Sequence, residues 1–401
     1  MTVLIVNAYS VRNRGDAAIV RGLIATLRQL GTHRIAVAPR GWRHDADEWL
    51  ALGADSVVPP LLSIHDAPRW ARAQRLLLLV HVIGRIARSL AARVTPILAD
   101  DSMRAYAQAA VVVSAGGAYL GGRKPGVNLV RGYSIAYGRI WARPTIAAPM
   151  TINPPSPLVR VLLRNLLRGV ALFVRDHESI ARARQLGLRA TYAPDLVFRA
   201  ARSRAPHPPS GIMAWVPRGY RPDQDAWAAR ERLEASQLAG VIDVMRTDPG
   251  LRLEFVPQVD VEGIDDDRVT IARLRGQLPA ELDGRVSVLP PPGAIEETIE
   301  AYARYDVVLT SRLHAALLAL LSGTPSLVVG YEPKVSGVLA TLGLDDRVIP
   351  ADGSWEPATV AEWLRRLMSD PGERDATRAA TQNVEAQYAS FDDLLRTKLA
   401  S

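Results

Sequence analysis

The chain contains no cysteine among its 401 residues. Disulfide bonds, thiol nucleophiles and cysteine-ligated zinc sites are therefore excluded, and the composition is consistent with a cytoplasmic protein. Histidine and aspartate do not recur at metal-ligand spacing either, so we expect no essential metal.

Long apolar runs are also missing. The longest clear one, Leu76–Ile83, includes His81 and is far shorter than the ~20 residues that a membrane span requires. The chain opens on a strand-like segment, residues 2–7, without the charged and apolar regions of a signal peptide. The sequence thus predicts neither a secretory leader nor an integral membrane anchor.

Arginines are numerous but scattered, and no basic run carries interleaved aromatic residues, so we expect no nucleic-acid partner. Lysine and arginine together number 49 against 41 for aspartate and glutamate, a net charge of +8. This excess suits anionic ligands such as phosphates, carboxylates and lipid-linked diphosphates. The hydrophobic fraction of 48% is typical of a folded chain, and the length suits two α/β domains.

Short β-branched runs alternate with longer helical segments. The alternation predicts strands near 2–7, 34–39, 109–114, 144–149 and 171–175, and again near 211–216, 251–257, 306–310 and 325–329. It is interrupted at residues 199–211, which hold three prolines and little apolar content.

This alternation favours an α/β fold with two Rossmann-like domains facing a cleft, the GT-B architecture of glycosyltransferases. The predicted domains are residues 1–198 on the acceptor side and 212–401 on the donor side, joined by a linker at 199–211. The last helical stretch, 371–398, is a candidate to pack back on the first domain.

Ligands of open α/β sheets bind at the carboxyl ends of the strands, so the loops there are the first candidates for a site. The first strand leads to Asn13-Arg14-Gly15-Asp16, where a helix begins. The simpler interpretation is a turn with Asp16 at or near the helix N-cap. The functional interpretation is an anion or sugar site, with Asp16 as a base.

A glycine-rich segment follows the strand near 109–114. It contains Gly116 and Gly117, a second glycine pair, and then two cations, Arg123 and Lys124. Paired glycines allow backbone N–H groups to approach a ligand closely, although such a loop alone is weak evidence.

Two further cations follow strand ends. Arg175 ends the strand near 171–175, and its planar guanidinium suits a carboxylate or phosphate. Lys334 comes after the strand near 325–329, in a loop that also presents Tyr331, and is either a phosphate ligand or a surface lysine.

The strongest motif is Ser311-Arg312-Leu313-His314, between a hydrophobic strand and an almost wholly apolar helix. Ser311 is a plausible N-cap, which would place Arg312 and His314 in the first turn. A positive helix end, a guanidinium and an imidazole would then meet at one place, as a phosphate site with a titratable group beside it requires.

In this order, the motifs resemble those of the polysaccharide pyruvyltransferases. The matching set spans about residues 7–343 and consists of Asn-x-Gly-Asp, the glycine pair, Arg-Asp-x-x-Ser, Pro194-Asp195, Ser-Arg-x-His and Tyr-x-x-Lys. Ala118 is a departure, because family members often have a third glycine there.

The resemblance implies transfer of pyruvate from phosphoenolpyruvate, a co-substrate, onto two hydroxyls of a saccharide or glycolipid, with no other cofactor. His314 would be the general acid and Asp16 the base. The donor's phosphate and carboxylate would be bound by Arg175, Ser311, Arg312 and Lys334. The acceptor or its loops would involve Asn13, Gly15, Gly116, Gly117 and Tyr331.

The segment from Arg69 to Arg93 carries six arginines around a leucine run. It is either a helix packed on the sheet or an interfacial helix that brings the enzyme to a lipid-linked saccharide. The second alternative would place a cytoplasmic protein peripherally at the inner face of the membrane.

Two other functions stay open at this point. A GT-B glycosyltransferase that uses a nucleotide sugar would want acidic residues for the ribose, for which Glu296, Glu297 and Glu300 are available. A non-catalytic saccharide-binding protein would bind glycan without releasing phosphate.

Overall fold

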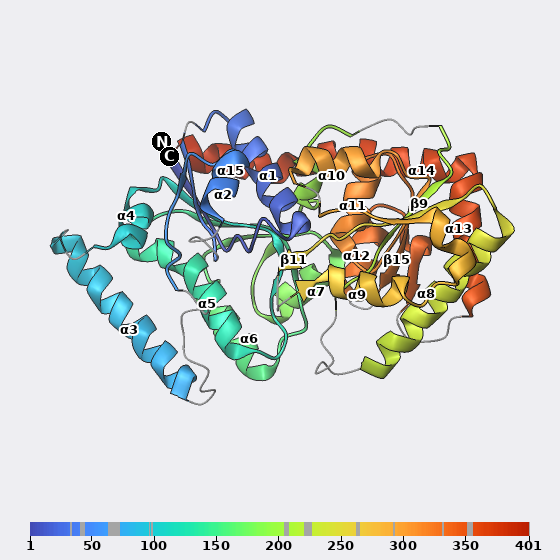
Figure 1. Ribbon diagram of the computed structural model, residues 1–401. Helices are drawn as coiled ribbons and strands as arrows, with labels where there is room; N and C mark the ends of the chain where they lie inside the picture. Colours follow the sequence, from blue (N-terminus) through green and yellow to red (C-terminus); the bar gives the residue numbers. More distant parts are fainter. Residues whose placement is uncertain are drawn as a thin grey trace. The chain divides into compact units, whose positions relative to one another are not determined.

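The computed structural model describes residues 1–32, 34–40, 45–62, 73–95, 97, 99–203, 208–219, 227–261, 265–291, 293–330, 333–350 and 356–400. The chain forms two compact units, both built from helices and parallel strands (Figure 1). Unit 1 comprises Met1–Val11, Ile19–Arg199 and Gln387–Ser401. Unit 2 comprises Arg12–Ala18 and Ala200–Ala386.

Unit 1 contains an eight-stranded parallel sheet with the order β3-β2-β1-β4-β6-β7-β8, and β5 also pairs with β6. The strands are β1 (Thr2–Val6), β2 (Arg34–Ala38), β3 (Ser56–Val57), β4 (Val111–Ser114), β5 (Gly117–Leu120), β6 (Thr145–Ile152), β7 (Ala171–Val174) and β8 (Ala190–Tyr192). The order reverses direction between β1 and β4, which is the switch point of this sheet.

The α-helices of unit 1 are α1 (Arg14–Gln29, which begins in the segment grouped with unit 2), α2 (Ala46–Ala51), α3 (Ala73–Val94), α4 (Asp101–Gln108), α5 (Pro125–Ala136), α6 (Pro157–Leu166), α7 (His177–Gln185) and α15 (Ala389–Ala400). Short 3₁₀ turns are η2 (Tyr137–Trp141) and η3 (Leu196–Arg199). Two apolar clusters join alternate strand residues to helices α3 to α7, which therefore cover one face of the sheet.

Unit 2 contains a six-stranded parallel sheet with the order β13-β10-β9-β14-β15-β16. Its strands are β9 (Ile212–Val216), β10 (Arg252–Phe255), β13 (Val286–Val288), β14 (Val307–Thr310), β15 (Ser326–Gly330) and β16 (Val348–Pro350). A two-residue pair, β11 (Asp260–Val261) and β12 (Asp265–Asp266), lies outside that sheet. The switch point of unit 2 lies between β9 and β14.

The helices of unit 2 are α8 (Trp227–Thr247), α9 (Asp267–Arg275), α10 (Ile295–Tyr302), α11 (Leu313–Leu321), α12 (Pro333–Thr341), α13 (Pro357–Ser369) and α14 (Pro371–Gln382), with 3₁₀ turns η4 (Ala280–Arg285), η5 (Asp345–Arg347) and η6 (Glu385–Tyr388), whose last residues fall in unit 1. One apolar cluster joins α8, α9 and α13 to the sheet. Helix α11 is buried at every residue except His314.

The prediction of an α/β fold from two Rossmann-like halves is confirmed by the two parallel sheets. The chain passes from the first sheet to the second between β8 and β9, in the region predicted to be a linker. Residues 371–398 are not one helix, since they divide into α14, η6 and α15.

Helix α15 belongs to unit 1. Arg199 binds Asp392 of this helix through Nη1 at 2.6 Å and Nη2 at 2.8 Å, and Phe391 packs edge-on against Phe173. Within the described part of the chain, no helix has both the length and the apolar character that crossing a bilayer needs.

Candidate active site at the switch point of unit 2

The carboxyl ends of β9 and β14 lie side by side at the switch point of unit 2. The hydroxyl of Thr310, the last residue of β14, donates to the carbonyl of Val216, the last residue of β9, at 3.0 Å. The same hydroxyl accepts a hydrogen bond from the backbone N–H of Arg312 at 2.9 Å. Thr310 therefore fixes the position at which helix α11 begins.

The start of α11 differs from the prediction in one respect. Arg312, and not Ser311, is the N-cap residue, with extended backbone angles and no side-chain capping bond. Ser311 is buried, and its N–H donates to the Val216 carbonyl at 3.2 Å. The prediction that Ser311 is the N-cap was therefore wrong. The helix begins one residue later than predicted, and the hydroxyl that binds a backbone N–H at this point is that of Thr310.

Arg312 forms a buried ion pair with Asp267, the first residue of α9. Its Nε lies 2.9 Å from Oδ2 and its Nη2 lies 2.5 Å from Oδ1 of that carboxylate. The Asp267 side chain is fully buried and that of Arg312 is 9% exposed. This bidentate geometry holds the guanidinium in one orientation at the N-terminus of α11.

Asp267 also accepts three backbone hydrogen bonds. Its oxygens receive the N–H groups of Gly219 at 2.8 Å, Gln258 at 3.0 Å and Val259 at 2.9 Å. A carboxylate with this many donors is a structural anchor, because it joins the loop after β9 and the loop after β10 to Arg312.

The loop after β10 in turn contacts the segment Arg12–Ala18. Asn13 forms an antiparallel bridge with Val259, the N–H of Arg14 donates to the Gln258 carbonyl at 3.3 Å, and the N–H of Asp260 donates to the Arg12 carbonyl at 3.3 Å. The sequence assigns these N-terminal residues to the first domain, whereas the structure groups them with unit 2.

Gly15 of this segment lies directly against His314. A Cβ atom built on Gly15 would stand 2.3 Å from Nδ1 and 2.4 Å from Cβ of the histidine, closer than real Cβ atoms come. Only glycine permits this approach. The structure therefore brings Gly15, predicted for the acceptor or its loops, against His314, predicted to act in catalysis, although the two are about 300 residues apart in the chain.

Asn13, and not Asp16, caps α1. The Asn13 side-chain oxygen accepts from the N–H groups of Gly15 at 3.2 Å and Asp16 at 3.3 Å. Asp16 is in the first turn and is half-buried. Its carboxylate is not needed as the cap, which leaves the proposed role as a base compatible with the fold.

Two buried residues beside this site, Tyr302 and Gln258, were not identified from the sequence. The Tyr302 hydroxyl donates to the Gln258 side-chain oxygen at 2.6 Å. Burial raises the pKa of Tyr302 well above its usual value, and the charge of Asp267 adds to this while Arg312 opposes it. Tyr302 is thus a neutral hydrogen-bond donor that holds the segment supporting Arg14.

Arg175 occupies a different setting. It follows β7 in unit 1, away from the β1–β4 switch point, and is 1% exposed. Its guanidinium is ion-paired with Asp195, and its Nε donates to the Thr151 hydroxyl at 3.1 Å. A buried ion pair away from the switch point favours a role in holding unit 1 together, and donor binding by Arg175 stays a prediction.

The glycine pair also has a packing explanation. A Cβ on Gly116 would stand 2.4 Å from the Pro149 carbonyl oxygen of β6, and Gly117 has a φ of +125°. Residues predicted to form a ligand loop, Gly117–Leu120, are strand β5. The close approach is therefore to a neighbouring strand, and a role at the acceptor stays a prediction.

Two predicted residues remain, Lys334 and Tyr331. Lys334 is the second residue of α12 and is half-buried. Tyr331 lies outside the described residues.

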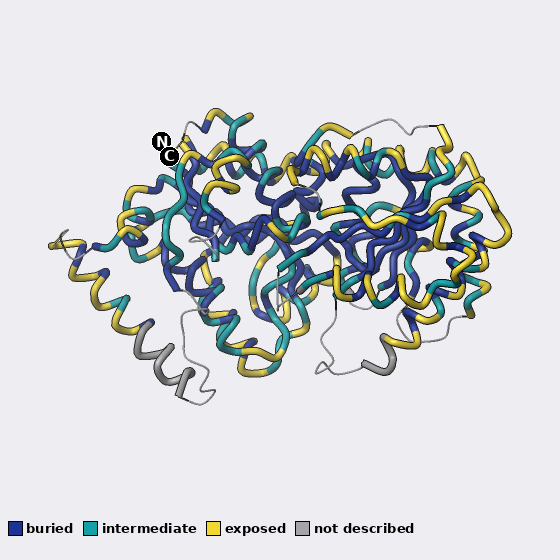
Figure 2. Tube along the Cα trace, viewed as in Figure 1, coloured by how far each residue is buried: buried dark blue, intermediate teal, exposed yellow. Residues whose placement is uncertain are grey.

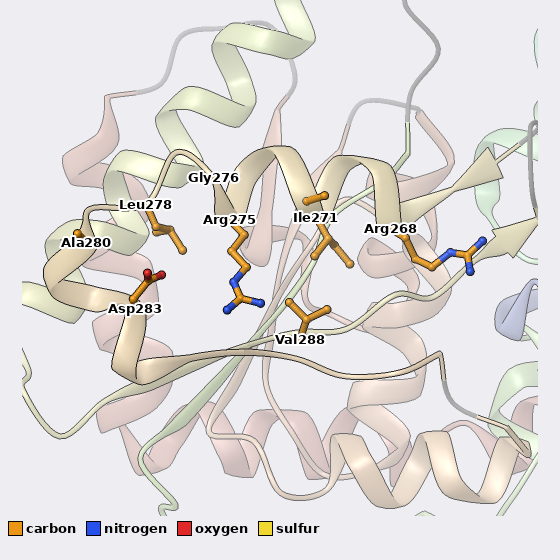
Figure 3. Close-up of a pocket in the computed structure, with 9 residues that line it drawn as sticks. Arg268, Ile271, Arg275, Gly276, Leu278, Ala280, Asp283 and Val288 are labelled. Carbon is orange, nitrogen blue, oxygen red and sulfur yellow. The ribbon is translucent and has the colours of Figure 1, made fainter.

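Two other features of the described residues bear on this site, the distribution of potential metal ligands and a hollow in unit 2. Among the described residues, no three potential ligands gather as a metal ion would need. A hollow of about 640 Å³ lies between α9, η4 and β13, and Figure 3 shows Arg275 and Asp283 among its lining residues. It contains none of the residues predicted to act in catalysis.

Replacing Gly15 by alanine is expected to lower turnover by up to about 10²-fold, because the new methyl group must displace His314 and such misplacements carry that cost. Elsewhere in a helix the same change stabilises by about 1 kcal/mol. Gly84→Ala in α3, where a Cβ meets no atom within 4 Å, is the matched control. Equal activity of the two variants would contradict the close contact.

The family model for polysaccharide pyruvyl transferase matches residues 13–333 of the chain. No curated protein sequence matches this chain.

Several solved structures share the fold across nearly the whole chain. A sucrose-phosphate synthase from Thermosynechococcus elongatus is 12% identical with a TM-score of 0.61, covering 100% of this chain and 99% of that one. A UDP-GlcNAc 2-epimerase from Neisseria meningitidis, bound to UDP-GlcNAc, is 12% identical with a TM-score of 0.57, covering 99% and 100%. The glycotransferase of kitacinnamycin is 15% identical with a TM-score of 0.53, covering 99% and 98%. At these identities the likeness establishes a GT-B-type fold and nothing about substrates.

Proposed function

Since the chain belongs to the polysaccharide pyruvyl transferase family, we propose that it transfers pyruvate from phosphoenolpyruvate onto two hydroxyls of a saccharide as a ketal and releases phosphate. The observation that carries the proposal is the contact between Gly15 and His314 at the switch point of unit 2. In this contact the imidazole at the start of a buried helix meets the first turn of α1, to which Asp16 belongs.

The reaction needs one proton donor and one proton acceptor. A proton added to the methylene carbon of phosphoenolpyruvate makes a methyl group and leaves cation character on the adjacent carbon. One saccharide hydroxyl attacks that carbon and loses its proton, phosphate departs, and the second hydroxyl closes the ring and loses its proton. Of the two hydroxyl protons, one balances the new C–H bond and the other leaves with phosphate.

We assign the first proton to His314 and the acceptance of a hydroxyl proton to Asp16. His314 is the second residue of α11, half-buried beside Gly15, so its ring is held where a ligand at the switch point would lie. Asp16 follows Gly15 directly and stands in the first turn of α1. Proton transfer by positioned groups of this kind is general acid–base catalysis.

The donor carries a phosphate and a carboxylate, which we assign to the N-terminus of α11 with Arg312 and to Lys334. The backbone N–H groups of a helix N-terminus favour an anion. Asp267 already holds the Arg312 side chain at that end of the helix. Arg312 therefore does not have to be ordered when the donor binds.

Lys334→Ala is expected to raise the KM for phosphoenolpyruvate about 10- to 100-fold with little change in kcat, because a hydrogen bond to a charged group contributes roughly 1.5–3 kcal/mol. Lys334 suits this test better than Arg312. Replacing Arg312 would also leave the buried Asp267 without its ion-pair partner and so change the stability of unit 2. Lys398→Ala, in α15 of unit 1, is the control. An unchanged KM would show that Lys334 does not bind the donor.

The proposed activity is tested by phosphate release from phosphoenolpyruvate with a panel of saccharide acceptors. Acceptor-dependent phosphate release, together with a ketal in the product, is expected. Release of a nucleotide from a nucleotide sugar, without phosphate from phosphoenolpyruvate, would instead identify a glycosyltransferase. Glycan binding with neither product would identify a non-catalytic binding protein.

A further inference from the structure

The described part of α3 leaves a line of bulky apolar side chains exposed. Ile83, Leu90 and Val94 are 57%, 51% and 86% exposed. Spacings of seven and four residues bring them onto one side of a helix with 3.6 residues per turn. Ile97, just beyond the helix, is exposed as well. Figure 2 shows exposed residues along this stretch.

The opposite side of α3 is firmly attached to unit 1. Val82 and Ala92 are buried in the apolar cluster with α4 and α5, and Arg85 forms an ion pair of 2.9 Å with Asp100. The exposed line is thus the side that faces away from the sheet, and the attachment fixes its direction.

Helix α6 repeats the pattern. Leu158 and Val161 are exposed, while Val159 and Leu163 are buried in the cluster with β6 and β7. Because α3 and α6 cover the same face of the eight-stranded sheet, their outer sides belong to one side of unit 1 (Figure 1). We call the exposed apolar residues of α3 and α6, with the arginines beside them, the outer face.

The outer face is cationic. Residues 67–99 and the whole of α6 contain no aspartate or glutamate. Arg88 and Arg93 are exposed on α3, and helical geometry places Arg93 next to the apolar line and Arg88 farther round the helix. Arg160 and Arg164 are exposed on α6.

We propose that the outer face docks on an anionic lipid surface. Exposed bulky apolar side chains together with exposed arginines, and no acidic residues, are what an interfacial helix presents to lipid headgroups and the upper acyl chains. Nucleic acid would not use the apolar line. A second copy of the chain, related by a two-fold axis, would place arginines against arginines. The net charge of +8 adds to the attraction.

This docking involves unit 1 alone and does not depend on the chemistry at His314. It is peripheral, since no described helix has the length and apolar character to cross a bilayer. If the acceptor of the proposed reaction is lipid-linked, docking would bring the enzyme to the surface that holds it.

The test is flotation of the full-length protein with phosphatidylcholine vesicles that contain or lack phosphatidylglycerol. We expect binding only to the anionic vesicles and weakening by added salt. The double variant Leu90→Asp, Val94→Asp should weaken binding at least about tenfold, and Arg88→Gln and Arg93→Gln about fivefold each. All four side chains are exposed, so the variants should keep the thermal unfolding midpoint of the parent.

Val269→Asp in unit 2, at a residue 69% exposed, is the matched control and should bind vesicles normally. Three results would each overturn the proposal: no flotation with anionic vesicles at low salt, an equal loss in the Val269→Asp control, or a lipid-free dimer that the Leu90→Asp, Val94→Asp variant dissociates. The last result would assign the outer face to self-association.

Discussion

The His314→Gln variant is expected to bind phosphoenolpyruvate like the parent but to turn it over about 10²–10⁴ times more slowly, the usual contribution of a general acid. Glutamine retains an N–H donor and much of the shape of the ring, so it can still hold a phosphate. It cannot deliver a proton to the methylene carbon. The measurement is phosphate release at saturating donor and acceptor, with the KM for the donor determined in parallel.

The chain offers a close control for this substitution. His177 is the first residue of α7, directly after a strand and a capping aspartate, so it shares the local setting of a helix start. It lies in unit 1 and stacks on Tyr192. His177→Gln should leave turnover unchanged. Near-normal turnover in His314→Gln would mean that His314 only binds phosphate and that the proton comes from another group or from water.

The strand–helix pattern around residues 306–322 could be predicted from sequence because both elements are strongly apolar and locally determined. The strand β14 lies within one residue of its predicted bounds, and the predicted apolar helix follows it as α11. The N-cap could not be assigned correctly, since Thr310, Ser311 and Arg312 are adjacent and only the Val216 carbonyl of another strand decides which hydroxyl binds where.

Contacts between distant segments were beyond sequence reasoning. The sequence shows Gly15 as a turn residue, and only the structure shows that its missing side chain makes room for His314. Asp267 similarly resembles an ordinary acidic residue at the start of a helix, although it anchors Arg312 and three backbone groups. The available signal was the run Asp265-Asp266-Asp267 at the start of α9, since one aspartate suffices as a cap.

Short and polar elements were missed for a related reason. Strands of two or three residues, such as β3 and β16, depend on pairing with a neighbour and carry no pattern of their own. Helix α4 has few apolar residues, so its periodicity is weak. None of these elements supplies a residue predicted to act in catalysis, so the predicted site did not depend on them.

Replacing Asp267 by alanine is expected to destabilise unit 2 by about 3–5 kcal/mol, the usual result of removing one partner of a buried ion pair. Arg312 would keep its charge in a site with little access to water. The N–H groups of Gly219, Gln258 and Val259 would also lose their acceptor. Thermal or urea unfolding, followed by a signal from unit 2, measures the loss.

A second buried ion pair of unit 2 provides a control variant that should lose stability but keep its activity. Arg347 binds Glu373 at 2.8 Å, with side chains 1% and 5% exposed. Among the described residues the other hydrogen bonds and ion pairs of these side chains go to Thr377 and Arg366, away from the switch point. Glu373→Ala should therefore be destabilised by a similar amount. Assayed well below both unfolding midpoints, it should retain normal turnover.

Under the same conditions Asp267→Ala should lose turnover as well. Asp267 holds the Gln258–Val259 backbone, and that backbone binds Asn13 and Arg14, which precede the Gly15–His314 contact. Loosening this chain of contacts displaces His314 relative to Asp16, and a displacement of about 1 Å can cost about 10²-fold in rate. If folded Asp267→Ala turns over as fast as Glu373→Ala, the carboxylate stabilises unit 2 without positioning the catalytic residues, and the link from α9 to His314 is wrong.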